Sequence, residues 1–280
     1  MVSLGYTMPP PNEVLLMKNL TVVKSNKVVE AGYRLSLNEQ RLVLACIAQI
    51  KKGQSLSVED KFTISASEFA SMFDIPLDGA YTELQKVSER LYERSVTIDS
   101  PDPENPKITF TRTRWITSIS YIPGDGQLVL QFAPQMIPYI SLLEAEFTRY
   151  SLASVAEMSS IYGIRFYELM MQWGSFGERM IEVPELKKML GLDGKYAAIK
   201  DFKCRVLDPA LHDINTCSDL TASYEQRKTG RRVSHLIFKF QPKGYTQKPK
   251  KITKQHIEKH ARPGETYQQV ELRLKASVAS

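Results

Sequence analysis

The most basic short segment of the chain runs from Arg227 to Arg232 and carries four cations and no acid in six residues. The cations are Arg227, Lys228, Arg231 and Arg232. Strand-like runs at 221–226 and 233–240 flank the segment around Gly230, so the pattern predicts the tip of a β-hairpin. Charges of one sign repel each other at such a tip, whereas contact with phosphate groups stabilises them. We therefore expect this hairpin to lie along a nucleic-acid backbone.

A helix expected to begin near Ala197 precedes this hairpin and presents cations of its own. At about 100° per residue, one face gathers the apolar side chains of Ile199, Phe202, Val206, Ala210 and Ile214. The opposite face presents Asp201, Cys204, Arg205, Asp208 and His212. Lys203 falls inside the apolar arc, so its ammonium group must extend outward. Because a recognition helix needs an outward polar face, Lys200, Lys203 and Arg205 are candidates for contact with DNA.

The same charges allow a second interpretation, because Asp201 and Arg205 stand four residues apart and could form an ion pair on a solvated helix surface. Pro209 lacks a backbone donor and disfavours helix at Asp208, which predicts a kink or a break there. All three candidate cations precede that point. They therefore lie in the N-terminal part of the helix, which enters the major groove in helix-turn-helix proteins.

The first half of the chain offers a weaker set of candidates: Lys86, Arg90, Arg112 and Arg114. The first two, together with Arg94, follow one side of a helix in which Glu83, Glu89 and Glu93 are interleaved. The other two are expected on one face of a hairpin strand. Weaker phosphate contact and a protein–protein role fit this half equally.

The elements that must hold these residues follow from apolar periodicity and turn signals. Ser36 and Glu39 form a capping-box pattern that predicts a buried helix to residue 50. The first half then predicts, in order, a strand at 61–64, a helix at 65–73, a turn at 74–79, a helix to about 94, and strands at 107–122 and 127–132. The second half predicts a helix at 153–173, a strand at 179–183, a helix from 184 that ends near 191, and the helix and hairpin described above.

The two halves repeat at an offset of 117 positions. The matching pairs are Ile64/Ile181, Glu68/Glu185, Phe69/Leu186, Met72/Met189, Phe73/Leu190 and Ile75/Leu192. Strand, helix-turn-helix and hairpin in this order are typical of a winged helix, so we predict an α+β fold with two tandem winged-helix domains. The expected organisation is a leader (1–19), a first domain (20–150), a second domain (151–241) and a basic tail (242–280).

Catalytic machinery is not recognisable in the sequence. Gly194-Lys195 lacks the first glycine and the Ser/Thr of a phosphate-binding loop. The four histidines form no His-apolar-His triplet, and His256 and His260 have no third ligand nearby. The three cysteines are widely spaced and include no C-x-x-C pair. We therefore predict a protein without catalytic residues, metal or cofactor, located in the cytoplasm and without a membrane span.

The formal net charge of +6 comes entirely from the C-terminal segment. Residues 241–280 hold nine Lys/Arg against three acids, whereas residues 1–240 hold 28 of each sign. The tail fits contact with a polyanion and a solvated disordered segment equally well. The local clusters above therefore carry the inference of nucleic-acid binding.

Five segments resemble the iteron-binding replication initiators of theta-replicating plasmids. They are 22–50 (VVKSNKVVEAGYRLSLNEQRLVLACIAQI), 161–177 (IYGIRFYELMMQWGSFG), 185–192 (ELKKMLGL), 202–215 (FKCRVLDPALHDIN) and 224–240 (YEQRKTGRRVSHLIFKF). The resemblance implies two winged-helix domains, with Lys200, Lys203, Arg205, Lys228, Arg231 and Arg232 at the matching DNA-facing positions. Cys204 departs from it, since a polar or basic residue is expected there.

The resemblance also implies a set of partners in a bacterial cell. A monomer would bind repeated double-stranded DNA sites at an origin and recruit the host DnaA and replicative helicase. A homodimer, formed largely through the first domain, would bind an inverted repeat and repress its own gene. A winged-helix transcriptional repressor without a replication role has the same physical features and remains the alternative.

Overall fold

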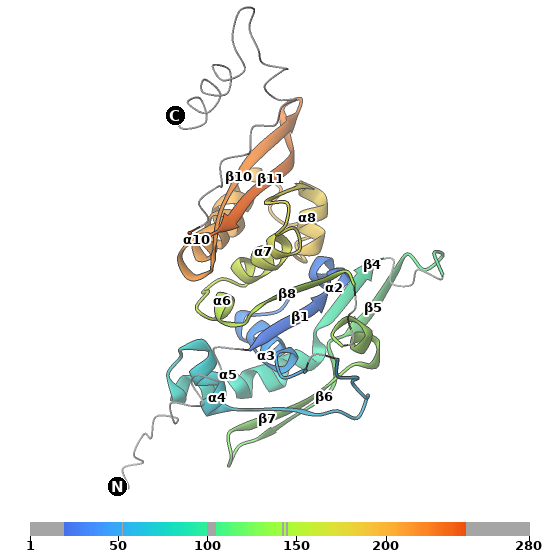
Figure 1. Ribbon diagram of the computed structural model, residues 1–280, viewed down its shortest axis with the longest axis vertical. Coiled ribbons are helices and arrows are strands. Elements are labelled where there is room, and N and C mark those ends of the chain that lie inside the picture. The colour runs from blue at the N-terminus through green and yellow to red at the C-terminus, as the bar shows by residue number, and fades with distance from the viewer. Residues whose placement is uncertain (1–19, 52, 100–104, 142, 144, 245–280) are drawn as a thin grey trace, which may run out of the picture. The chain divides into compact units, whose positions relative to one another are not determined.

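The computed structural model describes residues 20–51, 53–99, 105–141, 143 and 145–244 (Figure 1). Of the described residues, those from 20 to 242 belong to one compact unit. The predicted leader, all but the first three residues of the predicted tail, and the pair His256 and His260 lie outside the described residues.

The described part of the chain begins with a strand, as the β-like stretch at 20–24 predicts, followed by a short helix and a short strand that the sequence did not reveal. Strand β1 (Thr21–Ser25) pairs antiparallel with β8 (Phe147–Ser151), and helix α2 (Asn26–Glu30) and strand β2 (Gly32–Tyr33) follow. Helix α3 (Leu37–Ile47) then begins at the predicted capping box. The backbone N–H of Glu39 donates to the Ser36 hydroxyl at 3.3 Å, and the Glu39 carboxylate accepts from the Ser36 N–H at 2.7 Å. The predicted N-terminus of this helix is confirmed.

The first helix-turn-helix consists of α4 (Ala66–Phe73) and α5 (Leu77–Arg90). Asp74 ends α4 in the left-handed conformation with φ 48°, so the turn is shorter than predicted and α5 begins at Leu77 rather than after Gly79. Helix α5 buries Ala80, Leu84 and Val87, which recur along one face of the helix. The helix ends at Arg90 and is followed by the short 3-10 helix η1 (Leu91–Glu93).

The single strand predicted at 107–122 is wrong, because the chain divides there between two sheets. Strand β5 (Phe110–Arg114) pairs with β4 (Ser95–Asp99), whereas β6 (Ile116–Ile122) pairs with β7 (Gln127–Phe132). Trp115 lies at the division and is fully buried, with its ring 4.9 Å from that of Tyr33. Burial of this side chain fixes the point at which the strand changes sheets. The 3-10 helix η2 (Pro134–Tyr139) follows β7.

The single helix predicted at 153–173 is also wrong. It consists of α6 (Ala153–Ala156) and α7 (Ile161–Met171), separated by a segment held by a distant carboxylate. Asp213 accepts from the Ser159 hydroxyl at 3.0 Å and from the Ser160 N–H at 2.6 Å. These bonds keep residues 159–160 out of a helix and make Ser160 the N-cap of α7.

Helix α7 is followed by β9 (Glu178–Glu182) and α8 (Val183–Met189), which ends before Gly191. Helix α9 (Ile199–Phe202) passes through a π-helical turn (Lys203–Leu207) into α10 (Asp208–Cys217). The hairpin of β10 (Leu220–Thr229) and β11 (Arg232–Pro242) follows and is longer than predicted.

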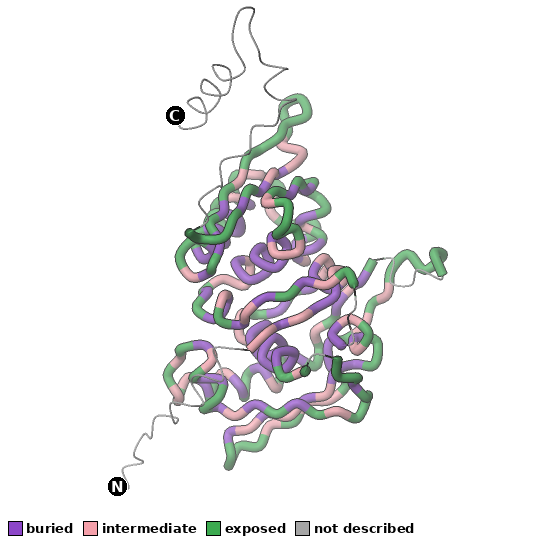
Figure 2. Tube along the Cα trace, viewed as in Figure 1, coloured by how far each residue is buried: buried purple, intermediate pink, exposed green. Residues whose placement is uncertain are grey.

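The two domains share one sheet topology. The first sheet has the order β3-β7-β6, where β3 is Phe62–Ser65, and the second has the order β10-β11-β9. In both, the strand before the helix-turn-helix pairs with the second strand of the hairpin. The repeat pairs lie at equivalent places, since Ile64 and Ile181 are buried in β3 and β9 and Phe69 and Leu186 in α4 and α8. Figure 2 shows buried residues along α3 and α7, whereas the tip of the β10–β11 hairpin is exposed.

Helix α7 buries a cluster of charged groups against β1 and β8. The Glu168 carboxylate forms an ion pair with Lys24 Nζ at 2.5 Å, accepts a hydrogen bond from the Tyr150 hydroxyl at 2.5 Å, and lies 3.5 Å from the Arg165 guanidinium. Arg165 also donates to the Tyr33 hydroxyl and to the carbonyls of Ala31 and Met189. Both Lys24 and Glu168 are fully buried. The cluster thus ties helix α7 to the strands β1 and β8 and to Tyr33.

Candidate nucleic-acid interface

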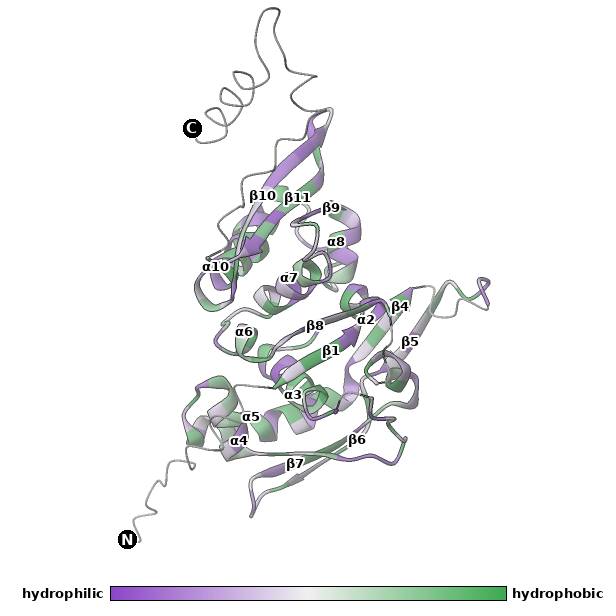
Figure 3. Ribbon diagram, viewed as in Figure 1, coloured by the Kyte–Doolittle hydropathy of each residue, from purple (hydrophilic) through white to green (hydrophobic). Residues whose placement is uncertain are grey.

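The β10–β11 hairpin places its four cations at an exposed tip. Gly230, at φ +62°, and Arg231 form the turn, and Thr229 pairs with Arg232 across it. The side chains of Arg227, Lys228, Arg231 and Arg232 are all exposed. None of the four forms an ion pair with a carboxylate of the described residues. The predicted hairpin tip is confirmed, and Figure 3 shows this end of the hairpin as hydrophilic.

A β-bulge shapes the hairpin just below its tip. The register shifts between Arg227, which pairs with His235, and Lys228, which pairs with Val233, so Ser234 is the extra residue. The Thr229 hydroxyl is 2.9 Å from the Ser234 hydroxyl, which also donates to the Arg227 carbonyl at 3.3 Å. A bulge of this kind increases the local twist of the strands and re-aims their side chains.

The helix before the hairpin buries the predicted apolar face. Phe202, Val206, Ala210 and Ile214 are fully buried, and Ile199 packs at the edge of the core. The opposite face is exposed as predicted, and Lys200 and Arg205 are both exposed. In the described part of the chain no ion pair joins Asp201 to Arg205, so the structure does not favour the alternative of a surface ion pair.

Pro209 widens this helix instead of breaking it. In a regular α-helix the proline ring would clash with the Arg205 carbonyl, which would also lose its donor. The π-helical turn at Lys203–Leu207 relieves this conflict, because the Asp208 N–H donates to the Lys203 carbonyl five residues before it. The break allowed by the sequence is absent, and Asp208 keeps helical dihedral angles of −64° and −44°.

Lys203 joins the helix to the hairpin. Its ammonium group extends out of the apolar arc, as predicted, and lies 5.8 Å from the centre of the Tyr224 ring on β10. The Tyr224 hydroxyl donates to Asp208 at 3.0 Å. Partial burial and this hydrogen bond raise the pKa of Tyr224 to about 12, so the phenol is neutral at physiological pH. Lys203 is therefore less free to reach DNA than Lys200 or Arg205.

Two further side chains position the helix, and neither was predicted from the sequence. Lys187 on α8 donates to the Tyr196 carbonyl at 2.8 Å and lies 5.3 Å from the Phe202 ring centre, which fixes the turn before α9. Asn215 pairs with Ala222, accepting from its N–H at 2.7 Å and donating to its carbonyl at 2.9 Å. The second pair holds α10 against the first strand of the hairpin.

The first domain presents its candidates in a different place from the one predicted. Arg112 and Arg114 lie on β5, outside the β6–β7 hairpin, because the strand divides at Trp115. Arg114 pairs with Glu93 at 3.0 Å and stacks over Tyr92 at 4.4 Å, and Arg112 donates to the Thr97 hydroxyl at 3.3 Å. The β6–β7 hairpin, residues 116–132, contains no Lys or Arg.

The cations of α5 are also partly engaged. Lys86 pairs with Glu83 at 2.8 Å, whereas Arg90 is exposed. Arg94, which follows the helix, binds both oxygens of Glu39 at 2.8 Å. The structure thus brings the cations of the second domain together at one hairpin and one helix, and leaves those of the first domain dispersed.

Over the described residues, no group of three His, Cys, Asp or Glu side chains could hold a metal ion. No helix in the same part of the chain is long and apolar enough to cross a membrane.

A strand, a helix-turn-helix and a hairpin in each half define a tandem winged-helix protein. Two family models match the chain in the same order. "Initiator Replication protein, WH1" matches residues 21–171, and "Initiator Rep protein, WH2" matches residues 182–240. The chain belongs to this family of replication initiator proteins, and the predicted family and the two winged-helix domains are confirmed.

Comparisons with individual proteins agree with this assignment. The chain is 28% identical over 229 residues to a replication initiation protein of Escherichia coli, across 79% of this chain and 70% of the relative. It is 26% identical over 253 residues to the PI protein of Escherichia coli, across 80% and 83%. A crystal structure of the Pi initiator protein in complex with iteron DNA is similar, with a TM-score of 0.68 at 25% identity. The match covers 80% of this chain and 97% of the Pi initiator chain.

Proposed function

We propose that this protein initiates plasmid replication by binding repeated double-stranded DNA sites at an origin, and that its second domain is the main reader. The exposed four-cation tip of the β10–β11 hairpin carries this proposal. The Pi initiator protein, to which the chain is similar, was solved with iteron DNA. Binding in this scheme requires no catalysis, cofactor or metal, and it takes place in the bacterial cytoplasm.

The positions of the cations in the second domain suggest different roles for its helix and its hairpin. The N-terminal part of the α9–α10 helix would enter the major groove, where Lys200 and Arg205 can reach base edges. The hairpin tip would lie along the phosphates, because an exposed turn reaches the backbone more readily than the base edges. Lys203, held beside Tyr224, would contribute charge rather than a base contact.

The hairpin is tested by the double variant Arg231→Ala/Arg232→Ala. If each arginine neutralises one phosphate, the log–log salt slope of binding becomes shallower by ~0.9 per contact, about 2 for the pair. The matched control is Lys61→Ala/Arg149→Ala, which removes the same charge from exposed positions of the first domain. An unchanged slope for the hairpin variant on its best site would contradict the assignment.

The α9–α10 helix, here called the reading helix, is tested by a change in sequence preference instead of salt dependence. Arg205→Ala should change which sequence is preferred, with a loss of about 1–3 kcal/mol of discrimination at one base pair. The hairpin variant should instead weaken binding to all sequences alike. Equal losses of affinity on all sequences for Arg205→Ala would indicate that this side chain contacts the DNA backbone.

A role in replication, as opposed to repression alone, is tested by transformation with the gene and adjacent repeats, which should sustain a plasmid.

The first domain is proposed to form the homodimer that represses the initiator's own gene at an inverted repeat. Strand β5 is the edge of its sheet, and Phe110 on it is 55% exposed, beside Ile108 at 36%. A second copy could pair with this edge, because unpaired strand edges accept further strands. Phe110→Asp should shift the sedimentation coefficient toward the monomer and favour direct repeats. A single concentration-independent species on both DNAs would count against the equilibrium.

Lys86, Arg90, Arg112 and Arg114 remain proposed sites of weaker phosphate contact or of protein contact. The host DnaA and replicative helicase are the proposed partners of the monomer at the origin, on the strength of the family. Capture of each purified host protein by the initiator on origin DNA is the direct test.

A further inference from the structure

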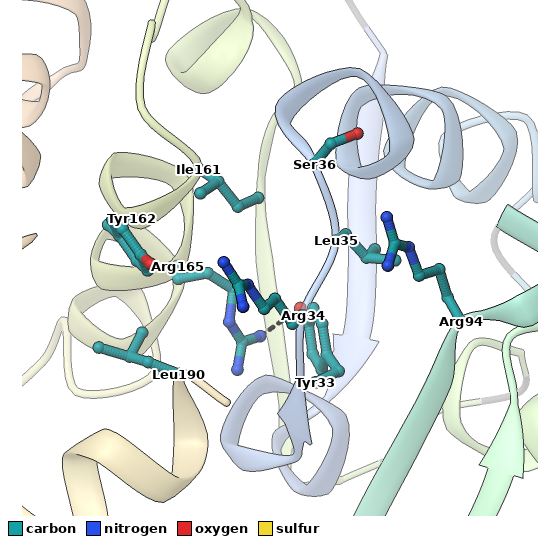
Figure 4. Close-up of a pocket in the computed structure, with 9 residues that line it drawn as sticks. All are labelled: Tyr33, Arg34, Leu35, Ser36, Arg94, Ile161, Tyr162, Arg165 and Leu190. Atoms are coloured by element: carbon teal, nitrogen blue, oxygen red, sulfur yellow. Dashed lines mark hydrogen bonds between the residues drawn. The ribbon is translucent and has the colours of Figure 1, made fainter. Parts of the chain in front are cut away.

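A pocket of about 410 Å³ lies between residues 33–36 of the first domain and the first turns of α7 (Figure 4). Leu35, Ile161 and Leu190 supply apolar walls, and Tyr33 and Tyr162 supply phenol rings. Three arginines complete the lining: Arg34, Arg94 and Arg165. Figure 4 shows Arg34 extending from its loop toward α7. No acidic residue lines this pocket.

The charges around the pocket do not balance. Arg94 is neutralised by Glu39, but Lys24 and Arg165 share the single carboxylate of Glu168. The Tyr150 phenol cannot supply a second negative charge, because burial and the Glu168 carboxylate raise its pKa well above the usual value. Arg34 is exposed and pairs with no carboxylate of the described residues. Two positive charges therefore remain without a counter-ion among these groups.

An anion in the pocket would lower the cost of this arrangement, since charge held in a partly buried site is stabilised by an opposite charge nearby. A guanidinium presents a planar fork of donors that matches the oxygens of a phosphate group. We propose that the pocket binds a phosphate group, with Arg34 as its principal ligand. That phosphate would come either from the backbone of bound duplex DNA or from a free nucleotide.

The position of Tyr162 connects the pocket to the reading helix. Tyr162 lines the pocket with Arg34, and burial raises its pKa, with smaller electrostatic contributions from Tyr196 and Arg34. Tyr196 in turn packs against Phe202 of α9, with ring centres 6.3 Å apart. A backbone phosphate beside the end of α9 could thus reach Arg34. The DNA source rests on the proposed function, whereas the free-nucleotide source does not.

Binding of a free phosphate-containing ligand is tested by calorimetric titration of the full chain with dAMP and with inorganic pyrophosphate. If the pocket takes free phosphate groups, the native protein binds at least one of these ligands. Arg34→Gln then weakens that binding about tenfold or more, the loss expected for one charge-assisted partner. Arg149→Gln is the matched control, because it removes the same charge from an exposed position on β8.

The DNA source is tested with the same two variants on a duplex carrying the best binding site. If Arg34 neutralises one backbone phosphate, the log–log salt slope of duplex binding becomes shallower by ~0.9 in the Arg34→Gln variant. The same slope is unchanged in the Arg149→Gln variant. Thermal unfolding without ligand is the folding check. Loss of an unbalanced cation should leave the midpoint of Arg34→Gln unchanged or raise it.

The combined results separate the possibilities. Nucleotide binding that depends on Arg34 supports the pocket with a free phosphate, and a reduced slope without nucleotide binding supports it with a backbone phosphate. If Arg34→Gln changes neither measurement, the proposal is overturned. In that case the DNA-binding function still stands if the Arg231→Ala/Arg232→Ala variant reduces the salt slope, so the two failures are distinguishable.

Discussion

Glu168→Gln should destabilise the protein far more than Lys24→Met, although the two side chains are direct partners. Glu168, Lys24 and Arg165 together carry a net charge of +1. Removal of the carboxylate raises this to +2 in a fully buried place, whereas removal of the ammonium group leaves a neutral Glu168–Arg165 pair. Breaking a buried pair so that its partner stays charged costs about 3–5 kcal/mol.

We therefore expect a loss of about 3–5 kcal/mol for Glu168→Gln. For Lys24→Met we expect a change within about 1 kcal/mol of zero, because an apolar group of similar size replaces the ammonium without leaving a charge unpaired. For a chain of this size, the first value corresponds to a fall in the thermal midpoint of about 6–20 °C. Urea unfolding followed by circular dichroism measures both.

Lys24→Met/Glu168→Gln completes the cycle and reports the coupling between the two side chains. The double variant should be more stable than Glu168→Gln alone, because it carries one buried cation fewer. If Lys24→Met costs as much as Glu168→Gln, the cluster is not limited by its single carboxylate, and the charge count around it is wrong.

Two further predictions concern the seam between the domains and the reading helix. Gly191→Ala should lower the free energy of unfolding clearly more than Gly194→Ala. Both glycines have positive φ, at +63° and +70°, but only at position 191 would the added Cβ lie close to a backbone atom, 2.8 Å from the Tyr33 carbonyl oxygen. The shared backbone cost is about 1–2 kcal/mol, so equal losses in urea unfolding would rule out the contact. Tyr224 should titrate at about 12, and Asp208→Asn should lower that pKa, as followed by NMR of ring-labelled tyrosine. Because the folded pKa is raised above 10, this tyrosine should lower stability as the pH rises from about 10 through 12.

The sequence predicted best what is decided within one or two helical turns. The capping box of Ser36 and the apolar face from Phe202 to Ile214 depend on spacing alone, and both are confirmed. The hairpin tip at Gly230 was equally local. The family followed from several such segments in the right order.

Long-range contacts decided what the sequence did not reveal. The break before α7 depends on Asp213, which lies more than 50 residues along the chain from Ser160. The division of the strand at Trp115 depends on the distant Tyr33, whose ring packs edge-on against the buried indole. Arg114 had to be judged as a free cation, because its partner Glu93 belongs to another element. A positive charge can be counted in a sequence, but its neutralisation depends on the tertiary structure.

Helix α7 has a consequence for any attempt to redirect this initiator to a new origin by exchanging its second domain. Gly163 brings one side of the helix close to α10, since a Cβ there would lie 2.9 Å from Asp213, and Phe166 packs on Phe238 of β11. Arg165 and Glu168, on the same helix, contact Tyr33 and Lys24 of the first domain. Gly163 and Phe166 thus contact the second half of the chain, whereas Arg165 and Glu168, interleaved with them on the same helix, contact the first half. A chimaera with a single crossover anywhere along α7 would inherit mismatched partners on one side, so the grafted sequence has to be interleaved residue by residue.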